Sequence, residues 1–294
     1  MRPELASSFV TRFAPSPTGL LHLGHAYSAL KAYDAAQAAD GRFILRIEDI
    51  DVTRCRPHFE AAIYEDLAWL GLAWEKPVLR QSDHLADYHA ALERLGEKGL
   101  LYREFRTRSE LASDIAGAPH GPIGPIVSGA ALPADEETER LARGEAFAWR
   151  LSLSAAREYL GTAWESLSFV EEGHGPDGET GLIMARPELA GDIVLARKDV
   201  GVAYHLAVVV DDARQGVTDV IRGRDLFEAA HIQRLLQALL DLPTPVYRHH
   251  PLLLGPDGKR LAKRNGAPAL RALRDAGETA EDVRRRIADA LAAS

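Results

Sequence analysis

The first fifty residues carry the pattern that most restricts how this chain can fold. A short apolar run at 9–13 is followed by a loop that contains two prolines and a glycine. Residues 24–40 then place apolar side chains at helical spacing, and 43–47 form another compact apolar run. Strand, turn, helix and strand in this order predict a parallel sheet covered by helices.

The second half of the chain also alternates predicted strands with a predicted helix. Residues 204–210 form a continuous apolar run, which we interpret as a strand ending in Asp211 and Asp212. A second predicted strand at 219–221 leads to Arg222, and a helical pattern follows at 226–240. Between the two halves lies an insertion of roughly 80 residues, a size compatible with a subdomain. We expect one α/β sheet split by this insertion.

Composition excludes several classes of protein. Hydrophobic residues make up 46% and charged residues 27%, which is ordinary for a folded domain. A formal charge of −8 argues against non-specific coating of nucleic acid, because such binding depends on clustered Lys and Arg. The single cysteine, Cys55, excludes an internal disulfide and a multi-thiolate zinc site. The start resembles no signal peptide and no apolar run is of membrane-spanning length, so we expect a cytoplasmic protein.

Two imidazoles stand at the predicted start of the first helix. His22 and His25 are three residues apart and therefore share a face. A helix N-terminus favours an anionic guest such as phosphate, and Gly24 would let a ribose or adenine ring approach the backbone. Taken alone, the pair is equally compatible with capping or surface histidines.

The order of several motifs identifies a family. The chain contains RFAPSPTG at 12–19, HLGH at 22–25, LRIEDID at 45–51, and VVVDD at 208–212 followed by VIRG at 220–223. This series resembles the catalytic core of glutamyl-tRNA synthetases, which are class I aminoacyl-tRNA synthetases, from about residue 11 to about residue 269. The resemblance implies a Rossmann-type (HUP-like) fold with ATP at the topological switch point. It also implies that Pro15–His25 is the HIGH region.

The resemblance assigns the site residues. His22, Gly24, His25 and Lys263 would bind ATP, with His22, His25 and Lys263 catalytic. The HIGH region comprises Pro15, Ser16, Pro17, Thr18, Gly19, Leu20, Leu21, His22, Leu23, Gly24 and His25. Residues that would bind glutamate are Arg12, Phe13, Ala14, Pro15, Ser16, Glu48, Tyr204 and Arg222.

A basic loop follows the second half of the sheet. The five positions Arg260, Leu261, Ala262, Lys263 and Arg264 resemble a degenerate KMSKS loop. Lys263 matches the lysine that neutralises charge on the departing pyrophosphate. Ala262 lacks the usual hydroxyl, and Arg260 replaces the first lysine with a planar, forked cation.

Glutamate brings one ammonium and two carboxylates, so its pocket needs groups of both signs. Arg222 matches the family's arginine for the side-chain carboxylate, which a bidentate guanidinium suits. Glu48 matches the group that receives the ammonium, and Tyr204 matches a second contact to the amino acid.

Two departures indicate a shortened branch of the family. The chain ends about 30 residues after Lys263, too few for the helical anticodon-binding domain of ordinary glutamyl-tRNA synthetases. The segment NGAPAL at 265–270 also resembles that branch. The resemblance implies tRNA-independent, ATP-dependent activation of glutamate to glutamyl-adenylate. Glutamate would then pass to queuosine in the anticodon of tRNA(Asp).

Other functions stay open at this stage. A truncated synthetase acting on tRNA(Glu) or a small carrier would share every motif before Arg264. A non-catalytic paralogue that binds ligand or RNA is a second alternative, which the loss of the loop hydroxyl at Ala262 keeps open. The joint presence of His22, His25, Glu48, Arg222 and Lys263 argues against it. Another nucleotidyl transferase with the same His-x-x-His core is a third.

The shortened branch often holds zinc in its insertion through a Cys-x-Cys pair, a tyrosine and a further cysteine. Here the segment is YREFRTR at 102–108, so Glu104 and Arg106 stand where the cysteines would be. An arginine cannot ligate a metal, and we expect no zinc there. The expected cofactor set is ATP with Mg²⁺ as substrate. The expected partners are L-glutamate and tRNA(Asp) carrying queuosine. We expect no association with a membrane, and we expect the protein to be a monomer.

The expected boundaries follow from these motifs. Residues 1–105 would form the first half of the Rossmann catalytic domain and 106–188 the inserted subdomain, acceptor-binding-like and without zinc. Residues 189–250 would form the second half, and 251–294 the KMSKS-like loop and a helical C-terminal segment. Within that segment Thr279 and Asp282 resemble a capping box.

Overall fold

The computed structural model describes residues 9–107, 110, 120–121, 124–125, 129, 131–197, 201–255 and 268–292. Its strands are β1 (Val10–Phe13), β2 (Arg42–Ile47), β3 (Leu79–Arg80), β4 (Leu101–Glu104), β5 (His120–Gly121), β6 (Gly124–Pro125), β7 (Ala148–Leu151), β8 (Ser168–Glu171), β9 (Gly181–Met184), β10 (Ile193–Arg197), β11 (Gly201–Val202), β12 (Asp219–Gly223) and β13 (Val246–His250). Its α-helices are α1 (Leu23–Ala38), α2 (Pro57–Trp69), α3 (Leu85–Glu97), α5 (Ala134–Ala142), α6 (Leu153–Leu160), α7 (Tyr204–Arg214), α8 (Phe227–Leu240), α9 (Leu270–Asp275) and α10 (Ala280–Ala292).

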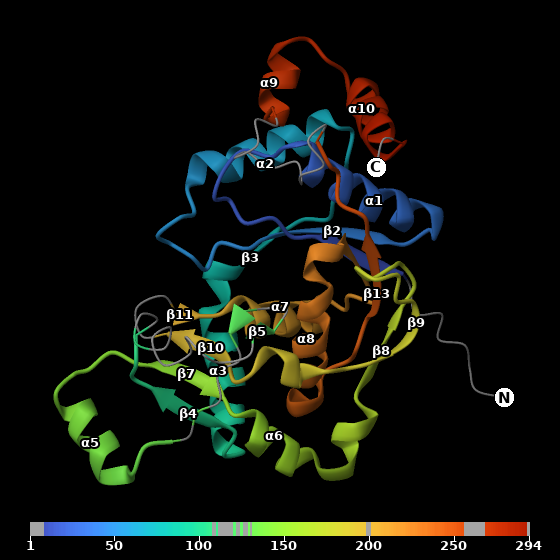
Figure 1. Cartoon of the computed structure of the whole chain (residues 1–294). Coiled ribbons are helices and arrows are strands. Elements are labelled where there is room, and N and C mark those ends of the chain that lie inside the picture. The colour runs from blue at the N-terminus through green and yellow to red at the C-terminus, as the bar shows by residue number, and fades with distance from the viewer. Residues whose placement is uncertain are drawn as a thin grey trace.

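Two mostly parallel sheets meet at the centre of the molecule (Figure 1). One has the order β1-β2-β3, and the other has the order β12-β13-β8-β9, in which only β9 is antiparallel. The Val10 backbone N donates to Thr218 Oγ1, and the Thr218 backbone N donates to the Val10 carbonyl, each at 2.9 Å. These bonds bring β1 beside β12, so the carboxyl ends of both sheets open on the same side. The expected α/β class with a split parallel sheet is confirmed.

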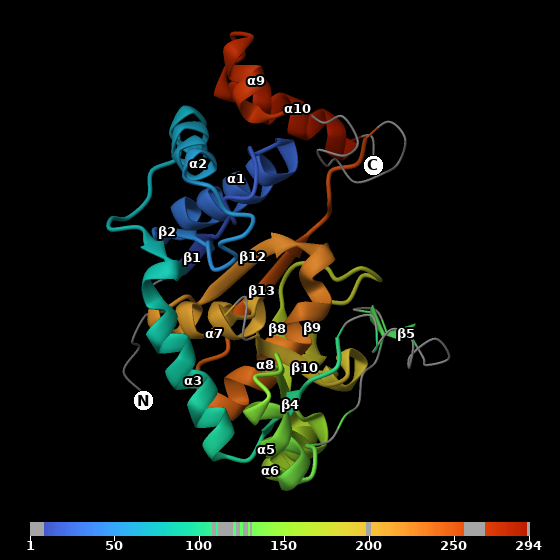
Figure 2. The same ribbon diagram turned by 90° about the vertical axis from the view of Figure 1, so that its left-hand side faces the viewer.

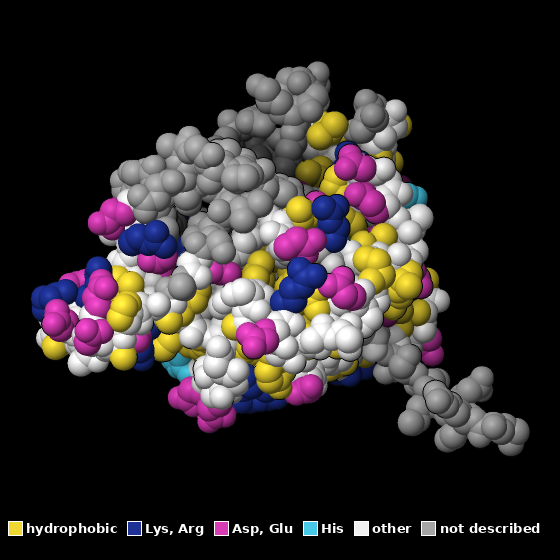
Figure 3. All heavy atoms as spheres, turned by 60° about the horizontal axis from the view of Figure 1, so that its bottom comes forward, with side chains coloured by type: hydrophobic (Ala, Val, Ile, Leu, Met, Phe, Trp, Pro, Cys, Tyr) yellow, Lys and Arg dark blue, Asp and Glu magenta, His cyan; other side chains and the backbone are white. Residues whose placement is uncertain are grey.

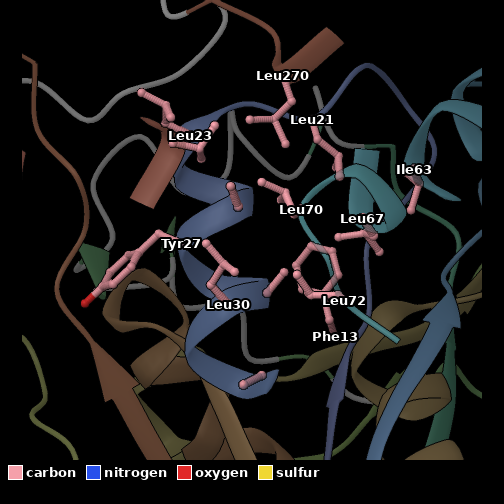
Figure 4. Packing of buried hydrophobic residues seen from close by; sticks show 14 of the residues in the cluster. Phe13, Leu21, Leu23, Tyr27, Leu30, Ile63, Leu67, Leu70, Leu72 and Leu270 are labelled. Atoms are coloured by element: carbon pink, nitrogen blue, oxygen red, sulfur yellow. The ribbon is translucent and has the colours of Figure 1, made fainter. Parts of the chain in front are cut away.

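Helices cover both faces of the paired sheets (Figures 1 and 2). On one face, α1 and α2 pack with α9 and α10 into an apolar core. Figure 4 shows Leu21, Leu67 and Leu70 gathered on one side of α1 with Leu270 of α9 above them, whereas Tyr27 extends from the opposite side of the helix. On the other face, α3, α7 and α8 pack against one another in a second core. The paired sheets are therefore packed against a separate apolar core on each face.

The insertion is organised around a separate antiparallel sheet with the order β11-β10-β7-β4. β8 and β9 lie inside the expected insertion, yet they pair with β13 of the central sheet. β10 and β11 lie beyond the expected boundary at residue 188, yet β10 pairs with β7 and β11 pairs with β10 in the sheet of the insertion. Strand pairing therefore crosses the boundaries expected from the sequence. Most of the Gly/Pro-rich stretch at 113–133 lies outside the described residues.

One predicted strand is wrong. The apolar run at 204–210 forms the first part of α7, not a strand. A short continuous apolar run fits a buried helix as well as a buried strand, and α7 is covered by α8, α3 and β10. Burial on several sides explains why the helix shows no polar face along this run. Asp211 and Asp212 consequently stand on the last turns of a helix.

The C-terminal helix begins as predicted. Thr279 Oγ1 accepts from the Asp282 backbone N at 3.2 Å, and an Asp282 carboxylate oxygen accepts from the Thr279 backbone N at 2.8 Å. This reciprocal pair is a capping box that satisfies donors at the helix N-terminus. Val283 and Ile287 turn the apolar side of α10 into the core beside α1.

Surface charges are mixed. On the face shown in Figure 3, Lys and Arg side chains alternate with Asp and Glu side chains among the described residues, without a broad field of one sign. The arginines at 284–286 that stand out in the sequence each pair with a carboxylate, from Asp34, Asp282 or Glu278. None of the helices in the described part of the chain combines the length and apolar character needed to cross a membrane.

Candidate active site

A cavity of about 440 Å³ opens at the carboxyl ends of β1 and β12, beside the start of α1. Its walls include every described residue that the sequence predicts to hold ATP or glutamate: Arg12, Phe13, Ala14, Pro15, Ser16, His22, Gly24, His25, Glu48, Tyr204 and Arg222. These residues come from segments up to two hundred positions apart, so only the fold brings them together. Lys263 and the rest of the KMSKS-like loop at 260–264 lie outside the described residues.

The HIGH region is divided between the cavity and the core. Thr18 joins the cavity wall, whereas Leu21 and Leu23 are buried in the core below α1. The two leucines anchor the segment, and His22 between them and Gly24 and His25 after them line the cavity. This alternation explains why a motif associated with nucleotide binding also contains apolar positions.

His22 and His25 both cap α1 and line the cavity. His22 Nδ1 accepts from the Gly24 backbone N at 3.1 Å, and His25 Nδ1 accepts from the His22 backbone N at 3.2 Å. The two ring centroids are 3.8 Å apart. In a neutral imidazole that accepts through Nδ1, Nε2 carries the proton and is a donor. Capping therefore fixes the tautomer of both rings, so the capping and functional interpretations coexist.

Glu48 follows β2 and belongs to a buried cluster of charges. Arg46 donates to Glu48 Oε1 at 3.1 Å and to Asp212 Oδ1 at 2.7 Å, and Arg12 Nε donates to Asp212 Oδ1 at 3.1 Å. Burial raises the pKa of Glu48, although Arg46 and Arg12 oppose that shift. Burial also acts on Asp212, but Arg12 and Arg46 outweigh it and lower its pKa. Asp211 and Asp212, assigned no role from the sequence, thus hold the arginines beside the cavity.

Arg222 stands at the carboxyl end of β12, as predicted, and is only 5% exposed. Its Nε donates to His249 Nε2 at 2.9 Å, Nη1 to Gln233 Oε1 at 3.0 Å and Nη2 to the Leu226 carbonyl at 2.9 Å. All three acceptors are neutral groups. In the described structure no carboxylate forms an ion pair with Arg222, although the side chain lines the cavity.

Tyr204 occupies the first turn of α7 rather than a strand end. It separates the main cavity from a second one of about 380 Å³, which shares Ser16, Thr18, Glu48 and Tyr204 with the first. Polar residues of the second cavity include Asp51, Gln81, Arg197 and His205. Burial lowers the pKa of His205 to about 4, so this imidazole is neutral at pH 7.

Several cavity residues were not predicted. His250 Nε2 lies 3.0 Å from Ser28 Oγ, and the Tyr27 ring packs edge-on against the His250 ring at 4.5 Å. Burial lowers the pKa of His250 to about 4. The sequence signal was the run HHPLLL at 249–254, of which His250, Pro251, Leu252 and Leu253 line the cavity.

The insertion does not offer zinc ligands at the positions of the family's cysteine pair. The Arg106 guanidinium donates to both Glu104 oxygens, at 2.9 and 2.7 Å. The carboxylate therefore already has a cationic partner, Arg106. Tyr102 OH donates to Asp192 Oδ2 at 3.0 Å. Among the described residues no group of three or more His, Cys, Asp or Glu side chains is placed to hold a metal ion. The residues present do not fit a zinc centre.

Comparison with known proteins agrees with this geometry. Residues 8–156 and 172–288 match the family described as tRNA synthetases class I (E and Q), catalytic domain. The chain belongs to this class I tRNA synthetase family. A glutamyl-Q tRNA(Asp) synthetase of Rhodobacter capsulatus is 48% identical over 95% of this chain and 99% of its own length. The glutamyl-Q tRNA(Asp) synthetase of Symbiobacterium thermophilum is 43% identical over 92% of this chain and 83% of its own length.

Longer members of the family are also similar. Glutamate–tRNA ligase 2 of Ruegeria sp. is 40% identical over 91% of this chain, which covers 57% of that protein. The crystal structure of a glutamate tRNA ligase from Elizabethkingia meningosepticum superposes with a TM-score of 0.70 at 28% identity. That match covers 88% of this chain and 52% of the ligase, so the chain spans about half the length of this solved relative. The predicted family and fold are therefore confirmed.

Proposed function

We propose that this protein activates L-glutamate with ATP to form glutamyl-adenylate and pyrophosphate, without needing tRNA. It then transfers the glutamyl group to a hydroxyl of queuosine in the anticodon of tRNA(Asp). Class I family membership supports the activation step, and the relatives named glutamyl-Q tRNA(Asp) synthetase support this acceptor. The observation that carries the proposal is one cavity that brings His22 and His25 together with Glu48 and Arg222.

The cavity offers glutamate both signs of charge. Glu48 suits the ammonium, because its Oε1 is already fixed by Arg46 and the residue lines the cavity. Arg222 suits the side-chain carboxylate, because its guanidinium carries a positive charge that no carboxylate of the described structure takes. Arg12 lies at the wall but shares Asp212 with Arg46, so it acts mainly through the local field.

In the first step the α-carboxylate of glutamate attacks the α-phosphorus of Mg-ATP in line, and the bond to pyrophosphate breaks. Catalysis requires positioning and neutralisation of charge rather than a covalent enzyme intermediate. His22 and His25 present Nε2–H donors at the N-terminus of α1, where the helix dipole also favours phosphate. Lys263 would neutralise the departing pyrophosphate.

In the second step the acceptor hydroxyl attacks the carbonyl carbon of the adenylate, and AMP leaves. The second cavity adjoins the first through Glu48 and Tyr204, so an acceptor placed there would reach the same reacting carbon. Its polar wall of Asp51, Gln81 and Arg197 suits a diol-bearing nucleoside. We therefore assign the main cavity to glutamate and ATP and the second cavity to the acceptor.

Glutamate-dependent ATP–pyrophosphate exchange tests the first step. His22→Ala and His25→Ala should each lower the exchange rate by roughly 10²–10³-fold, the usual cost of removing one preorganised donor. His89→Ala is the matched control, because His89 is exposed on α3 away from both cavities and should leave exchange unchanged. A loss below tenfold in both active-site variants would contradict the assigned roles.

Acceptor choice separates the remaining alternatives. The proposal expects exchange without tRNA, and transfer of labelled glutamate to tRNA(Asp) carrying queuosine. Transfer to tRNA(Glu) instead would establish a shortened glutamyl-tRNA synthetase. Folded protein that binds glutamate but shows no exchange would establish a non-catalytic paralogue. Exchange driven by another amino acid would establish a different nucleotidyl transferase.

A further inference from the structure

Arg222 is held in place by a chain of buried groups that continues beyond the cavity. Its three observed bonds use three of the five N–H donors of a guanidinium, and leave one on each terminal nitrogen. The acceptors are an imidazole, an amide oxygen and a backbone carbonyl. A neutral set of partners orients the side chain without cancelling its charge.

The chain ends in a buried carboxylate. His249 Nδ1 lies 2.5 Å from Glu171 Oε2, and the side chains of both residues are fully buried. Glu171 Oε1 accepts from the backbone N–H of His249 and of Gly173, each at 2.8 Å. Both oxygens of the Glu171 carboxylate therefore accept hydrogen bonds, which holds the carboxylate in place beside the imidazole.

The hydrogen bonds fix the proton on one ring nitrogen. A guanidinium can only donate, so His249 Nε2 must accept from Arg222 and Nδ1 must carry the proton toward Glu171. Burial raises the pKa of Glu171, but the bonds from His249 and Gly173 outweigh it and lower that pKa below its ordinary value. Burial and Arg222 lower the pKa of His249 despite the bond to Glu171. A neutral imidazole thus stands between a carboxylate and a guanidinium.

The backbone is built to hold this chain. Arg222 and His249 are register partners on the parallel strands β12 and β13, and Glu171 ends β8, the next strand. Gly173 follows, and a Cβ at that position would lie 2.2 Å from the His249 carbonyl oxygen. The close approach of the loop allows the Gly173 N–H to reach Glu171. Three adjacent strand ends therefore supply one group each.

We propose that Glu171 and His249 are positioning residues that fix the Arg222 guanidinium so that the enzyme selects a dicarboxylic amino acid over its amide. The selection rests on the proposed function, in which Arg222 receives the side-chain carboxylate. A carboxylate in direct contact with Arg222 would compete with the substrate carboxylate. Moving the buried negative charge one imidazole away preserves the orientation and leaves the guanidinium attractive to an anionic ligand.

Glu171→Gln tests the positioning role. An amide that donates to His249 Nδ1 moves the ring proton to Nε2, where it faces the Arg222 N–H, and the arginine loses its acceptor. We expect the KM for glutamate in pyrophosphate exchange to rise by about 10- to 100-fold. The preference for glutamate over glutamine in kcat/KM should fall by a similar factor, with the KM for ATP unchanged. Glu172→Gln, the exposed neighbour, should behave as the parent.

A second pair of variants separates positioning from packing. His249→Gln retains one acceptor and one donor on a single amide, whereas His249→Leu retains neither. The glutamine variant should keep more of the glutamate preference than the leucine variant at matched thermal stability. Equal loss in both would overturn the hydrogen-bond role, as would an unchanged KM and preference in folded Glu171→Gln.

Calorimetric titration of glutamate and glutamine, without ATP, keeps the two proposals distinguishable. A parent protein that binds glutamate but does not exchange pyrophosphate contradicts the proposed activity, while the effect of Glu171→Gln on binding still decides the positioning role. If the parent exchanges pyrophosphate normally and Glu171→Gln binds glutamate and glutamine with the affinities of the parent, only the positioning role is contradicted. A folded parent that neither binds nor activates glutamate overturns both.

Discussion

Two buried arginines near the cavity, Arg46 and Arg222, are held in opposite ways. Arg46 is fully buried and contacts three carboxylates, those of Glu48, Asp211 and Asp212. Burial disfavours its charge, but these carboxylates outweigh burial and raise the pKa of Arg46. Arg222 is 5% exposed and lines the cavity, and it donates to neutral acceptors only, with Glu171 beyond His249.

Under the proposed function, this difference in partners separates an arginine that holds the framework from one that receives the substrate carboxylate. A guanidinium surrounded by carboxylates has no charge to offer a ligand, and it ties β2 to the end of α7 across the sheet. A guanidinium oriented by neutral groups keeps its charge for a carboxylate that enters the cavity. Both side chains are buried arginines, but their partners differ and only Arg222 lines the main cavity.

The largest effect is expected from Arg46→Met. Removing the cation leaves Asp211, Asp212 and Glu48 buried without their shared partner, which should lower the free energy of unfolding by about 3–5 kcal/mol. Urea denaturation measures the change, and Arg143→Met at the exposed C-terminal cap of α5 is the matched control. A decrease in the free energy of unfolding of less than about 1 kcal/mol would contradict a framework role for Arg46.

Arg222→Met should have its main effect on activity. We expect kcat/KM for glutamate in pyrophosphate exchange to fall by about 10²–10³-fold, because a charge-assisted contact to substrate is lost. The free energy of unfolding should fall less than in Arg46→Met, because only neutral partners are left behind. Equal destabilisation by the two substitutions would contradict the distinction between framework and receptor.

Acid should destabilise the fold through its buried histidines before it protonates the Asp212 carboxylate. Burial lowers the pKa of His231 and of His250 to about 4, while the unfolded chain binds these protons near pH 6.5. The unfolded state therefore gains protons first, and stability falls as the pH drops from 6.5 toward 4. Around Arg46, Asp212 has a lowered pKa and keeps its contribution until the pH falls below its ordinary value.

Urea titrations at pH 6.5 and pH 5 measure this dependence. The free energy of unfolding should fall by roughly 1–2 kcal/mol for each of the two histidines over that interval. His231→Gln should show a shallower dependence than the parent, since one of the two groups no longer titrates. The same slope in both proteins would show that His231 does not contribute.

The smallest effect is expected from Arg284→Ala. Arg284 pairs with both Asp34 oxygens, at 2.8 and 3.0 Å, but the two side chains are about half exposed. Exposed pairs contribute little, so the free energy of unfolding should change by less than about 1 kcal/mol. A change as large as that of Arg46→Met would show that pairing geometry, not burial, sets the contribution of these arginines.

Much of the site was predictable because its groups sit in local patterns. His22 and His25 are close in sequence and begin a helix, Glu48 follows β2, and Arg222 lies near the end of β12. The partners of these residues were not predictable in the same way. Asp212 meets Arg12 across 200 positions, and Glu171 meets His249 across 78, so no window of sequence contains either pair.

The sequence by itself determined the parallel α/β frame, the histidine pair at the first helix and the two charged strand ends, because short-range periodicity and turn residues encode these features. The tertiary structure alone decided that residues 204–214 are helical and that strands on both sides of residue 188 pair across it. It alone showed that carboxylates surround Arg46 whereas neutral acceptors surround Arg222. Those outcomes depend on burial and on partners from distant segments, and neither is written in the neighbouring residues.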